Sequence, residues 1–146
     1  MIAQQQYRLL HDIYVLLDDG DHRVLAAFDL TPSQYAVLQL LDSHEGSRLT
    51  TVSDRLLLAR STITRIVDQL EATGLVRRES DPDDRRAQRV SLTAEGEAQR
   101  KAAQEAHDRS VTQRLMTLKP AEHKQLCSLL TKLQQSLRDQ LDPDIC

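Results

Sequence analysis

Residues 60–65 combine hydroxyl and guanidinium side chains at the start of a predicted helix. Their sequence is Arg60-Ser61-Thr62-Ile63-Thr64-Arg65, and four apolar residues at helical spacing give the segment one buried face: Ile63, Ile66, Val67 and Leu70. Ser61 and Arg65 are then expected to point away from the core. Short hydroxyls and an arginine near a helix N-terminus suit the phosphates and base edges of a major groove. An ordinary amphipathic surface helix is the alternative interpretation.

A charged turn after this helix offers two further arginines. Residues 81–86 read Asp-Pro-Asp-Asp-Arg-Arg, which is typical of a turn, between strand candidates at 75–79 and 88–92. Arginine at the tip of such a hairpin suits a narrow minor groove, where the negative potential is enhanced. Asp84 can orient a neighbouring guanidinium through a charge-assisted pair. We expect Arg86, rather than Arg85, to enter the groove. A solvated turn is the alternative.

Four helices are predicted before the hairpin from apolar periodicity and capping residues. They span about 5–28, 31–42, 50–57 and 60–72. Thr31 and Gln34 form a capping box around Pro32, which suits the first helical position. Gly74 is placed to end the fourth helix. The glycine and three aspartates at 18–21 are expected to weaken or bend the first helix.

Two further helices are predicted after the hairpin. Thr93 caps a helix to about Leu118, and alanines at every fourth position would let another helix approach closely: Ala98, Ala102 and Ala106. Pro120 opens the last helix, which carries a seam of leucines: Leu126, Leu130, Leu133, Leu137 and Leu141. The expected fold is mainly α with a small β-hairpin. It has six helices and a winged helix-turn-helix lobe at about 30–92, within a single domain of 1–146.

Five motifs occur in order along the chain. They are Leu30-Thr31-Pro32-x-Gln34-Tyr35, Arg60 to Arg65, Asp68-x-Leu70-Glu71-x-x-Gly74-Leu75-Val76-Arg77-Arg78, Asp81-Pro82-x-Asp84-Arg85-Arg86 and Leu92-Thr93-x-x-Gly96. Together they resemble the multiple-antibiotic-resistance regulator (MarR) family over about residues 5–141. The resemblance implies a C2 homodimer built on helices 5–28 and 93–141. It also implies recognition helices in successive major grooves of a pseudo-palindrome, with the wings in flanking minor grooves.

The resemblance also implies which residues bind DNA. They lie on the fourth helix and at the hairpin tip: Arg60, Ser61, Thr62, Thr64, Arg65, Asp84, Arg85 and Arg86. Three positions depart from the family pattern. Leu57 stands where the turn often has glycine, Ala59 where a capping serine is common, and Lys119 where a cap usually precedes the proline. The missing cap at Ala59 is expected to cost the fourth helix about 1 kcal/mol. Together, Leu57 and Ala59 also bear on the geometry of the turn between the third and fourth helices.

Composition limits the class of protein. The net charge is −3, and the chain is 40% hydrophobic but only 3% aromatic, so an aliphatic core is expected. Residues 60–89 are net positive, with seven arginines against six acids. No apolar run approaches the roughly 20 residues of a membrane span, and no secretory signal is visible. A cytoplasmic protein without membrane contact is expected.

Histidines and cysteines indicate no metal or catalytic site. None of the five histidines pairs with another at i+3 or i+4, so surface positions are expected, although His44 and His107 could converge on zinc. Cys127 lies beside the leucine seam, so a buried structural thiol is expected rather than an oxidant sensor. Cys146 is expected to be free. No nucleophile motif or phosphate loop is evident, so neither enzyme activity nor a cofactor is expected.

The expected function is transcriptional regulation by a ligand-responsive repressor that binds a pseudo-palindromic operator as a homodimer. The resemblance implies a small aromatic or amphipathic effector, and His11, Tyr14 and Tyr35 are the candidates to line its crevice. Core packing is the alternative role that we favour for both tyrosines. The alternative function is a winged-helix protein-interaction module without sequence-specific DNA binding. Arg65 and Arg86 would then be dispensable, and binding would depend little on salt.

Overall fold

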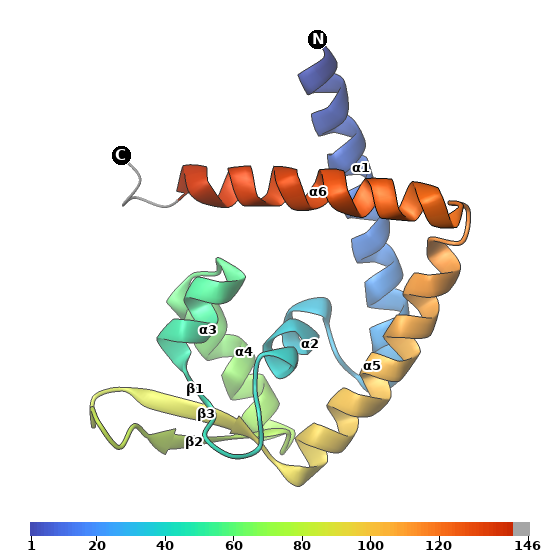
Figure 1. The fold of residues 1–146 in the computed structure, drawn as a ribbon. Helices are drawn as coiled ribbons and strands as arrows, with labels where there is room; N and C mark the ends of the chain where they lie inside the picture. The colour runs from blue at the N-terminus through green and yellow to red at the C-terminus, as the bar shows by residue number, and fades with distance from the viewer. Residues whose placement is uncertain (142–146) are drawn as a thin grey trace. The chain divides into compact units, whose positions relative to one another are not determined.

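The computed structural model describes residues 1–141 and divides into two compact units, Met1–Arg109 and a second that begins at Ser110. The helices are α1 (Ile2–Leu25), the short 3₁₀ helix η1 (Ala26–Phe28), α2 (Pro32–Gln39), α3 (Leu49–Leu56), α4 (Arg60–Ala72), α5 (Ala94–Arg114) and α6 (Pro120–Leu141) (Figure 1). The strands are β1 (Ser47–Arg48), β2 (Val76–Ser80) and β3 (Gln88–Leu92). The predicted fold class is confirmed. Within residues 1–141, no helix is long and apolar enough to cross a membrane.

The start of α2 has the predicted capping box. The Oγ1 of Thr31 accepts a hydrogen bond from the backbone N–H of Gln34 at 3.1 Å, and the Oε1 of Gln34 accepts one from the N–H of Thr31 at 3.0 Å. Pro32 occupies the first turn, where its missing N–H needs no partner. The Nε2 of Gln34 also donates to the Oε1 of Gln69 at 3.1 Å, which links the cap of α2 to α4.

A left-handed residue ends α3 and turns the chain into α4. Leu57 has φ 53° and ψ 40°, a left-handed conformation that is energetically unfavourable for a residue with a side chain. Its side chain is 77% exposed, so apolar burial does not offset this cost. Ser53 Oγ donates to the carbonyl of Leu58 at 2.6 Å and closes the turn. Ala59 then precedes α4 without a side-chain cap. Both departures from the family pattern are therefore real features of this turn.

The buried face of α4 belongs to the core of the first unit. Ile63, Ile66, Val67 and Leu70 are each at most 3% exposed, which confirms the predicted face. The other buried members are aliphatic, as expected: Leu25, Leu30, Val37, Leu38, Leu41, Val52, Val76, Val90, Leu92 and Ala103. Because this face is held in the core, the opposite face of α4 is directed toward solvent. Gly74, at φ 80°, follows α4 and ends it as predicted.

The sheet has the order β1-β3-β2, with both pairs antiparallel. The β2–β3 register runs from Val76 opposite Leu92 to Ser80 opposite Gln88, so residues 81–87 form the hairpin turn, called the wing below. The hairpin was predicted, but β1 was not. Two residues are too few to give the alternation that identifies a strand.

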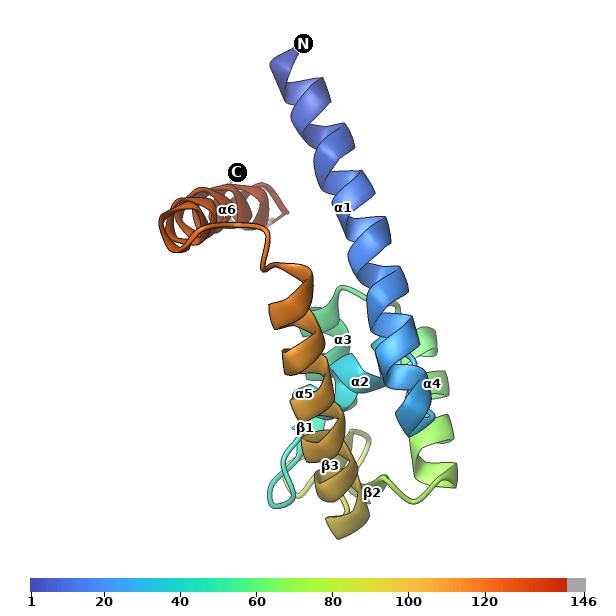
Figure 2. The ribbon, with the colours of Figure 1, turned by 90° about the vertical axis from the view of Figure 1, so that its right-hand side faces the viewer.

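The beginning of α5 is fixed to the sheet. The Oγ1 of Thr93 accepts a hydrogen bond from the N–H of Gly96 at 3.0 Å and donates to the carbonyl of Gly74 at 2.6 Å, which confirms Thr93 as the cap. Gly96 is buried against the backbone of Leu75. Two side chains continue the attachment along α5: Gln99 donates to the carbonyl of Phe28 at 2.7 Å, and Arg100 to that of Leu41 at 2.6 Å. These contacts attach the first half of α5 to the chain on both sides of α2 (Figure 2).

The predicted weak point in α1 is wrong, since the helix continues through residues 18–21 to Leu25. Asp18 and Asp19 each pair with a basic residue one turn later: with His22 at 3.4 Å and with Arg23 at 2.8 Å. Such i, i+4 pairs stabilise a helix and offset the cost of the glycine. Residues 26–28, expected to be part of the same helix, form the tighter helix η1.

Three other predicted boundaries are also wrong. The second helix ends at Gln39 rather than at Asp42, whose Oδ1 instead accepts hydrogen bonds from the N–H groups of His44 and Gly46, both at 2.9 Å. Such side-chain bonds favour a turn over a helix. The third helix begins at Leu49 rather than at the Thr50 or Thr51 that capping chemistry favours, because β1 leads directly into it. The fifth ends at Arg114 rather than at Leu118.

The second unit contains α6, whose apolar seam is exposed. Its leucines are at least 39% exposed: Leu126, Leu130, Leu133, Leu137 and Leu141. Cys127 is also exposed, so the expectation of a buried thiol is wrong; no residue of α6 is buried in this chain. The N–H of Lys119, before α6, donates to Glu122 Oε2 at 2.7 Å. Cys146 lies outside the described residues. The single-domain organisation stays a prediction.

Candidate nucleic-acid interface

The outer face of α4 presents the predicted hydroxyl and guanidinium groups to solvent. Arg60, Ser61, Thr64 and Arg65 are exposed, and Thr62 is half-buried. The hydroxyl of Thr64 donates to the carbonyl of Arg60 at 2.9 Å. Since a threonine hydroxyl has one proton, that of Thr64 remains available only as an acceptor. The face therefore offers cationic donors at both ends of a short run of hydroxyls.

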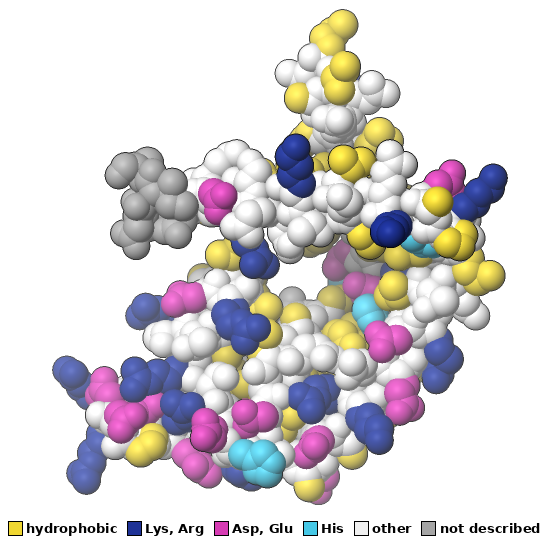
Figure 3. Space-filling model, viewed as in Figure 1, with side chains coloured by type: hydrophobic (Ala, Val, Ile, Leu, Met, Phe, Trp, Pro, Cys, Tyr) yellow, Lys and Arg dark blue, Asp and Glu magenta, His cyan; other side chains and the backbone are white. Residues whose placement is uncertain are grey.

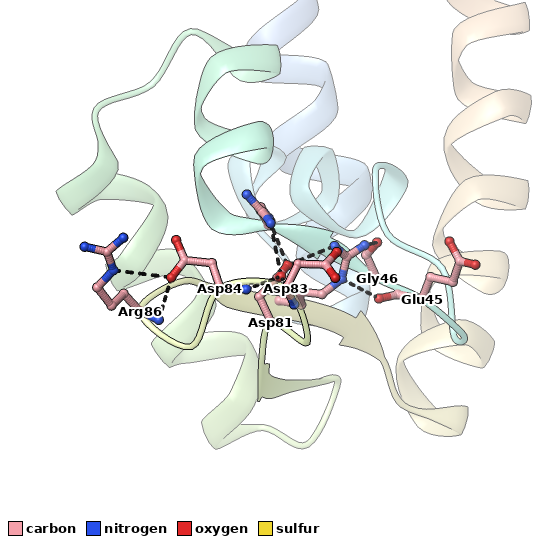
Figure 4. A network of polar contacts seen from close by, with 8 residues as sticks. Glu45, Gly46, Asp81, Asp83, Asp84 and Arg86 are labelled. Carbon is pink, nitrogen blue, oxygen red and sulfur yellow. Dashed lines mark hydrogen bonds and ion pairs between the residues drawn. The ribbon is translucent and has the colours of Figure 1, made fainter.

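The wing presents its two arginines in different ways. Both Arg85 and Arg86 are exposed, and the Arg86 side chain is 93% exposed. The Oδ1 of Asp84 accepts a hydrogen bond from the backbone N–H of Arg86 at 3.0 Å and lies 3.4 Å from its Nε (Figure 4). Asp84 therefore orients Arg86, as the sequence predicts. That Arg86 enters a minor groove stays a prediction.

A groove of about 360 Å³ lies between the wing and the first turns of α3 and α4. Eight of its ten lining residues are of polar types, and four of these are arginines: Arg48, Leu49, Thr50, Arg60, Thr64, Ser80, Arg85, Arg86, Ala87 and Gln88. The groove thus joins Arg60 and Thr64 of α4 with both wing arginines, whereas Ser61, Thr62, Arg65 and Asp84 are not part of its lining. Basic side chains gather around the wing with acidic ones among them (Figure 3). Guanidinium groups around one concavity favour a polyanion, and Arg60 and Arg85 contribute most here because Arg48 pairs with Asp81 and Arg86 with Asp84.

Asp81 supports the wing from inside. Its side chain is fully buried, and its carboxylate lies 2.8 Å from the Nε of Arg48 and 3.1 Å from the Nη1 of Arg89. The hydrogen bond from Arg48 is the main cause that holds the pKa of Asp81 far below its ordinary value; the N–H groups of Asp83 and Asp84 act in the same direction, and burial opposes them. The same pairing raises the pKa of Arg48.

Sequence reasoning missed Arg48 and the role of Asp81. Asp81 was recognised only as a turn former, and Arg48 stood in an expected polar loop. The two residues are 33 positions apart. Neither periodicity nor a local motif connects such a pair, so only the antiparallel pairing of β1 with β3 brings them together.

The three candidate effector residues have different surroundings. Tyr14 is 65% exposed on α1, so core packing is wrong for this tyrosine in the single chain. The exposed His11 stacks on Tyr7, with ring centroids 6.3 Å apart. Tyr35 is half-buried, and its ring centroid lies 5.2 Å from that of His107, whose Nε2 is 3.0 Å from Asp21 Oδ1. Burial, followed by the nearby charge of Asp108, raises the pKa of Tyr35. Tyr35 thus belongs to a polar cluster that contains neither His11 nor Tyr14.

Metal-binding side chains do not gather at any point of residues 1–141. No group of three histidine, cysteine or acidic side chains is arranged there to hold an ion. His107, which the sequence left open as a zinc ligand with His44, is paired with Asp21 instead.

The sequence is similar to known transcriptional regulators. The model of the MarR family matches residues 30–87. The uncharacterized HTH-type transcriptional regulator YkoM of Bacillus subtilis is 29% identical over 130 residues, which cover 89% of this chain and 84% of that protein. The HTH-type transcriptional regulator PrsX of Escherichia coli is 40% identical over 82 residues, which cover 55% of this chain and 49% of PrsX. The chain thus matches about half the length of PrsX.

Solved structures share the fold over nearly the whole chain. The MepR–DNA complex of S. aureus aligns with a TM-score of 0.80 at 23% identity, covering 89% of this chain and 96% of MepR. CouR of Rhodococcus jostii, solved with bound p-coumaroyl-CoA, aligns with a TM-score of 0.78 at 24% identity, covering 98% of this chain and 96% of CouR.

Proposed function

We propose that this chain, whose residues 30–87 match the model of the MarR family, is a transcriptional regulator of that family and binds double-stranded DNA. The observation that carries the proposal is the groove lined by Arg48, Arg60, Arg85 and Arg86, beside the exposed face of α4. The hydroxyls and Arg65 of α4 contact base edges in the major groove of the DNA. The arginine-lined groove of the protein binds the phosphate backbone, and the wing contacts the flanking minor groove. MepR, which shares this fold, was solved bound to DNA.

We propose that the active form is a homodimer and a repressor. Both terminal helices carry apolar side chains that are exposed in the single chain, including Leu16 of α1 and Leu129 of α6 at 70% and 58%. Large exposed apolar faces mark interaction surfaces. A twofold pairing would present two α4 helices to DNA, and such helices lie roughly 34–36 Å apart to reach successive major grooves. The protein would act in the cytoplasm without catalysis.

We propose that a small aromatic or amphipathic molecule controls DNA binding. The half-buried cluster of Tyr35, His107 and Asp21 joins α2 of the DNA-binding lobe to α1 and α5. A ligand bound there would shift the position of the DNA-binding lobe only if it had different affinities for two arrangements of the lobe relative to α1 and α5. CouR, of the same fold, holds p-coumaroyl-CoA. His11 and Tyr14 remain proposed contributors from the exposed surface of α1.

Selection from random-sequence duplexes tests the proposal. Full-length protein is expected to enrich an inverted repeat whose half-site centres lie about 10–10.5 base pairs apart, or a multiple of that spacing. R65A should lose the preference at particular positions of the repeat, while R23A, which removes an exposed arginine paired with Asp19, should enrich the same repeat. Folded protein that enriches no sequence would contradict the proposal and favour a protein-interaction module.

A further inference from the structure

The carboxylate of Asp81 has more hydrogen-bond partners than any turn-forming role requires. Its Oδ1 accepts from the N–H groups of Asp83 and Asp84, at 2.9 and 3.1 Å, and these bonds shape the turn. Its remaining bonds come from two arginines: Arg48 donates through Nε at 2.8 Å and Nη2 at 3.0 Å, and Arg89 through Nη1 at 3.1 Å. A carboxylate has about four lone-pair positions, so this one is saturated.

The two arginines connect the wing to separate parts of the lobe. Arg48 is the last residue of β1 and directly precedes α3. Arg89 lies on β3 and also donates to the carbonyls of Glu45 and Gly46, both at 3.0 Å. The loop before β1, the start of α3 and the wing therefore meet at one buried carboxylate (Figure 4). Bidentate arginine–carboxylate pairing fixes direction as well as distance.

The same carboxylate is linked to Arg86 through the wing backbone. Asp81 accepts from the N–H of Asp84, and the side chain of Asp84 in turn accepts from Arg86. The β2–β3 ladder ends at Ser80 opposite Gln88, so the tip lies beyond the last ladder pair. The position of the wing arginines relative to α4 therefore depends on the Asp81 contacts in addition to the sheet.

From this geometry we propose that Asp81 is a positioning residue for DNA binding, which holds the wing at the distance from α4 at which Arg86 and Arg65 engage one duplex together. The inference rests on the proposed DNA-binding function. Asp81 itself is buried and touches no DNA; it acts through Arg48, Arg89 and Asp84. Without the two arginine pairs the wing turn still forms, but its direction is no longer set.

Double-mutant cycles test this inference on the duplex that the wild-type protein selects. D81N is the decisive variant because an asparagine oxygen still accepts from the N–H groups of Asp83 and Asp84 but no longer pairs with two guanidinium groups. R86A should weaken binding about tenfold in the wild type, as expected for one good arginine contact, and only about twofold in the D81N background. R65A should weaken binding by the same factor in both backgrounds.

If Asp81 has a merely structural role, R86A should weaken binding by the same factor in both backgrounds. That result would overturn the inference. Retained DNA binding and an unchanged effect of R65A would then leave the proposed function intact. R89Q keeps the Arg48 pair and is the milder variant if D81N does not fold; it should show the same selective loss of the R86A effect at smaller size. Circular dichroism of each variant verifies folding. Wild-type protein without any DNA binding would overturn the proposed function and this inference together.

Discussion

G96A is expected to destabilise the first unit by about 3 kcal/mol, the upper part of the range for overpacked sites. A Cβ at this position would lie 1.8 Å from the carbonyl oxygen of Leu75 and 2.8 Å from its carbonyl carbon. Backbone atoms on both sides of this contact cannot rotate away. The carbonyl of Leu75 also accepts from the N–H of Thr93 at 3.1 Å, so α5 must separate from the end of α4 to relieve the clash.

The predicted loss of stability in G96A is opposite in sign to the usual effect of replacing a helical glycine by alanine. Within an ordinary helix, replacing glycine by alanine stabilises by up to about 1 kcal/mol. Urea unfolding followed by circular dichroism measures the difference. A98G, at an exposed position one half-turn later in the same helix, is the matched control and should lose only about 1 kcal/mol. A neutral or stabilised G96A variant would show that α5 does not pack on Leu75 as described.

The double variant L130R/L137R is expected to convert the proposed dimer to monomers. The two leucines lie seven residues apart on one face of α6 and are 41% and 50% exposed. Burying a fully exposed leucine contributes about 1.5–3 kcal/mol, and these side chains have about half of their surface left to bury. Four of them in a twofold interface then contribute about 3–6 kcal/mol, or roughly 10²- to 10⁴-fold in the dimer Kd.

Sedimentation equilibrium at micromolar concentration measures the mass of the protein in solution and so tests the dimer prediction. Wild-type protein should have twice the chain mass of 16.6 kDa, and the double variant the single mass. L57R is the control, since Leu57 is the same residue type, is even more exposed, and lies in the turn before α4. It should remain dimeric. A monomeric wild type, or a double variant that still dimerises as tightly, would contradict the assignment of α6 to the interface.

Local chemistry was sufficient to predict the elements that carry the interface. The capping box at Thr31 and Gln34, the buried face of α4 and the hairpin each depend on residues close together in the sequence. The same holds for Asp84 and Arg86, which are two residues apart. These features could be predicted because short-range hydrogen bonds and periodicity determine them.

Long-range contacts could not be predicted in the same way. The Arg48–Asp81 pair and the strand β1 depend on the approach of segments 33 to 43 residues apart, for which the sequence carries no local signal. The continuity of α1 was missed because the i, i+4 pairs of Asp18 and Asp19 offset a glycine that otherwise favours a break. The exposure of Tyr14 and Cys127 was missed for another reason: apolar periodicity identifies a face to be covered but not whether the same chain covers it.

The central claim is that α4 and the wing bind the charged backbone of DNA as one surface, and the salt dependence of binding tests it most directly. The slope of log K against log salt should be steeply negative for the wild type. R60A and R85A, which each remove a groove arginine assigned to the phosphate backbone, should each make it shallower by about one, while R23A should leave it unchanged. A wild-type slope near zero, or slopes that neither interface variant alters, would contradict the claim.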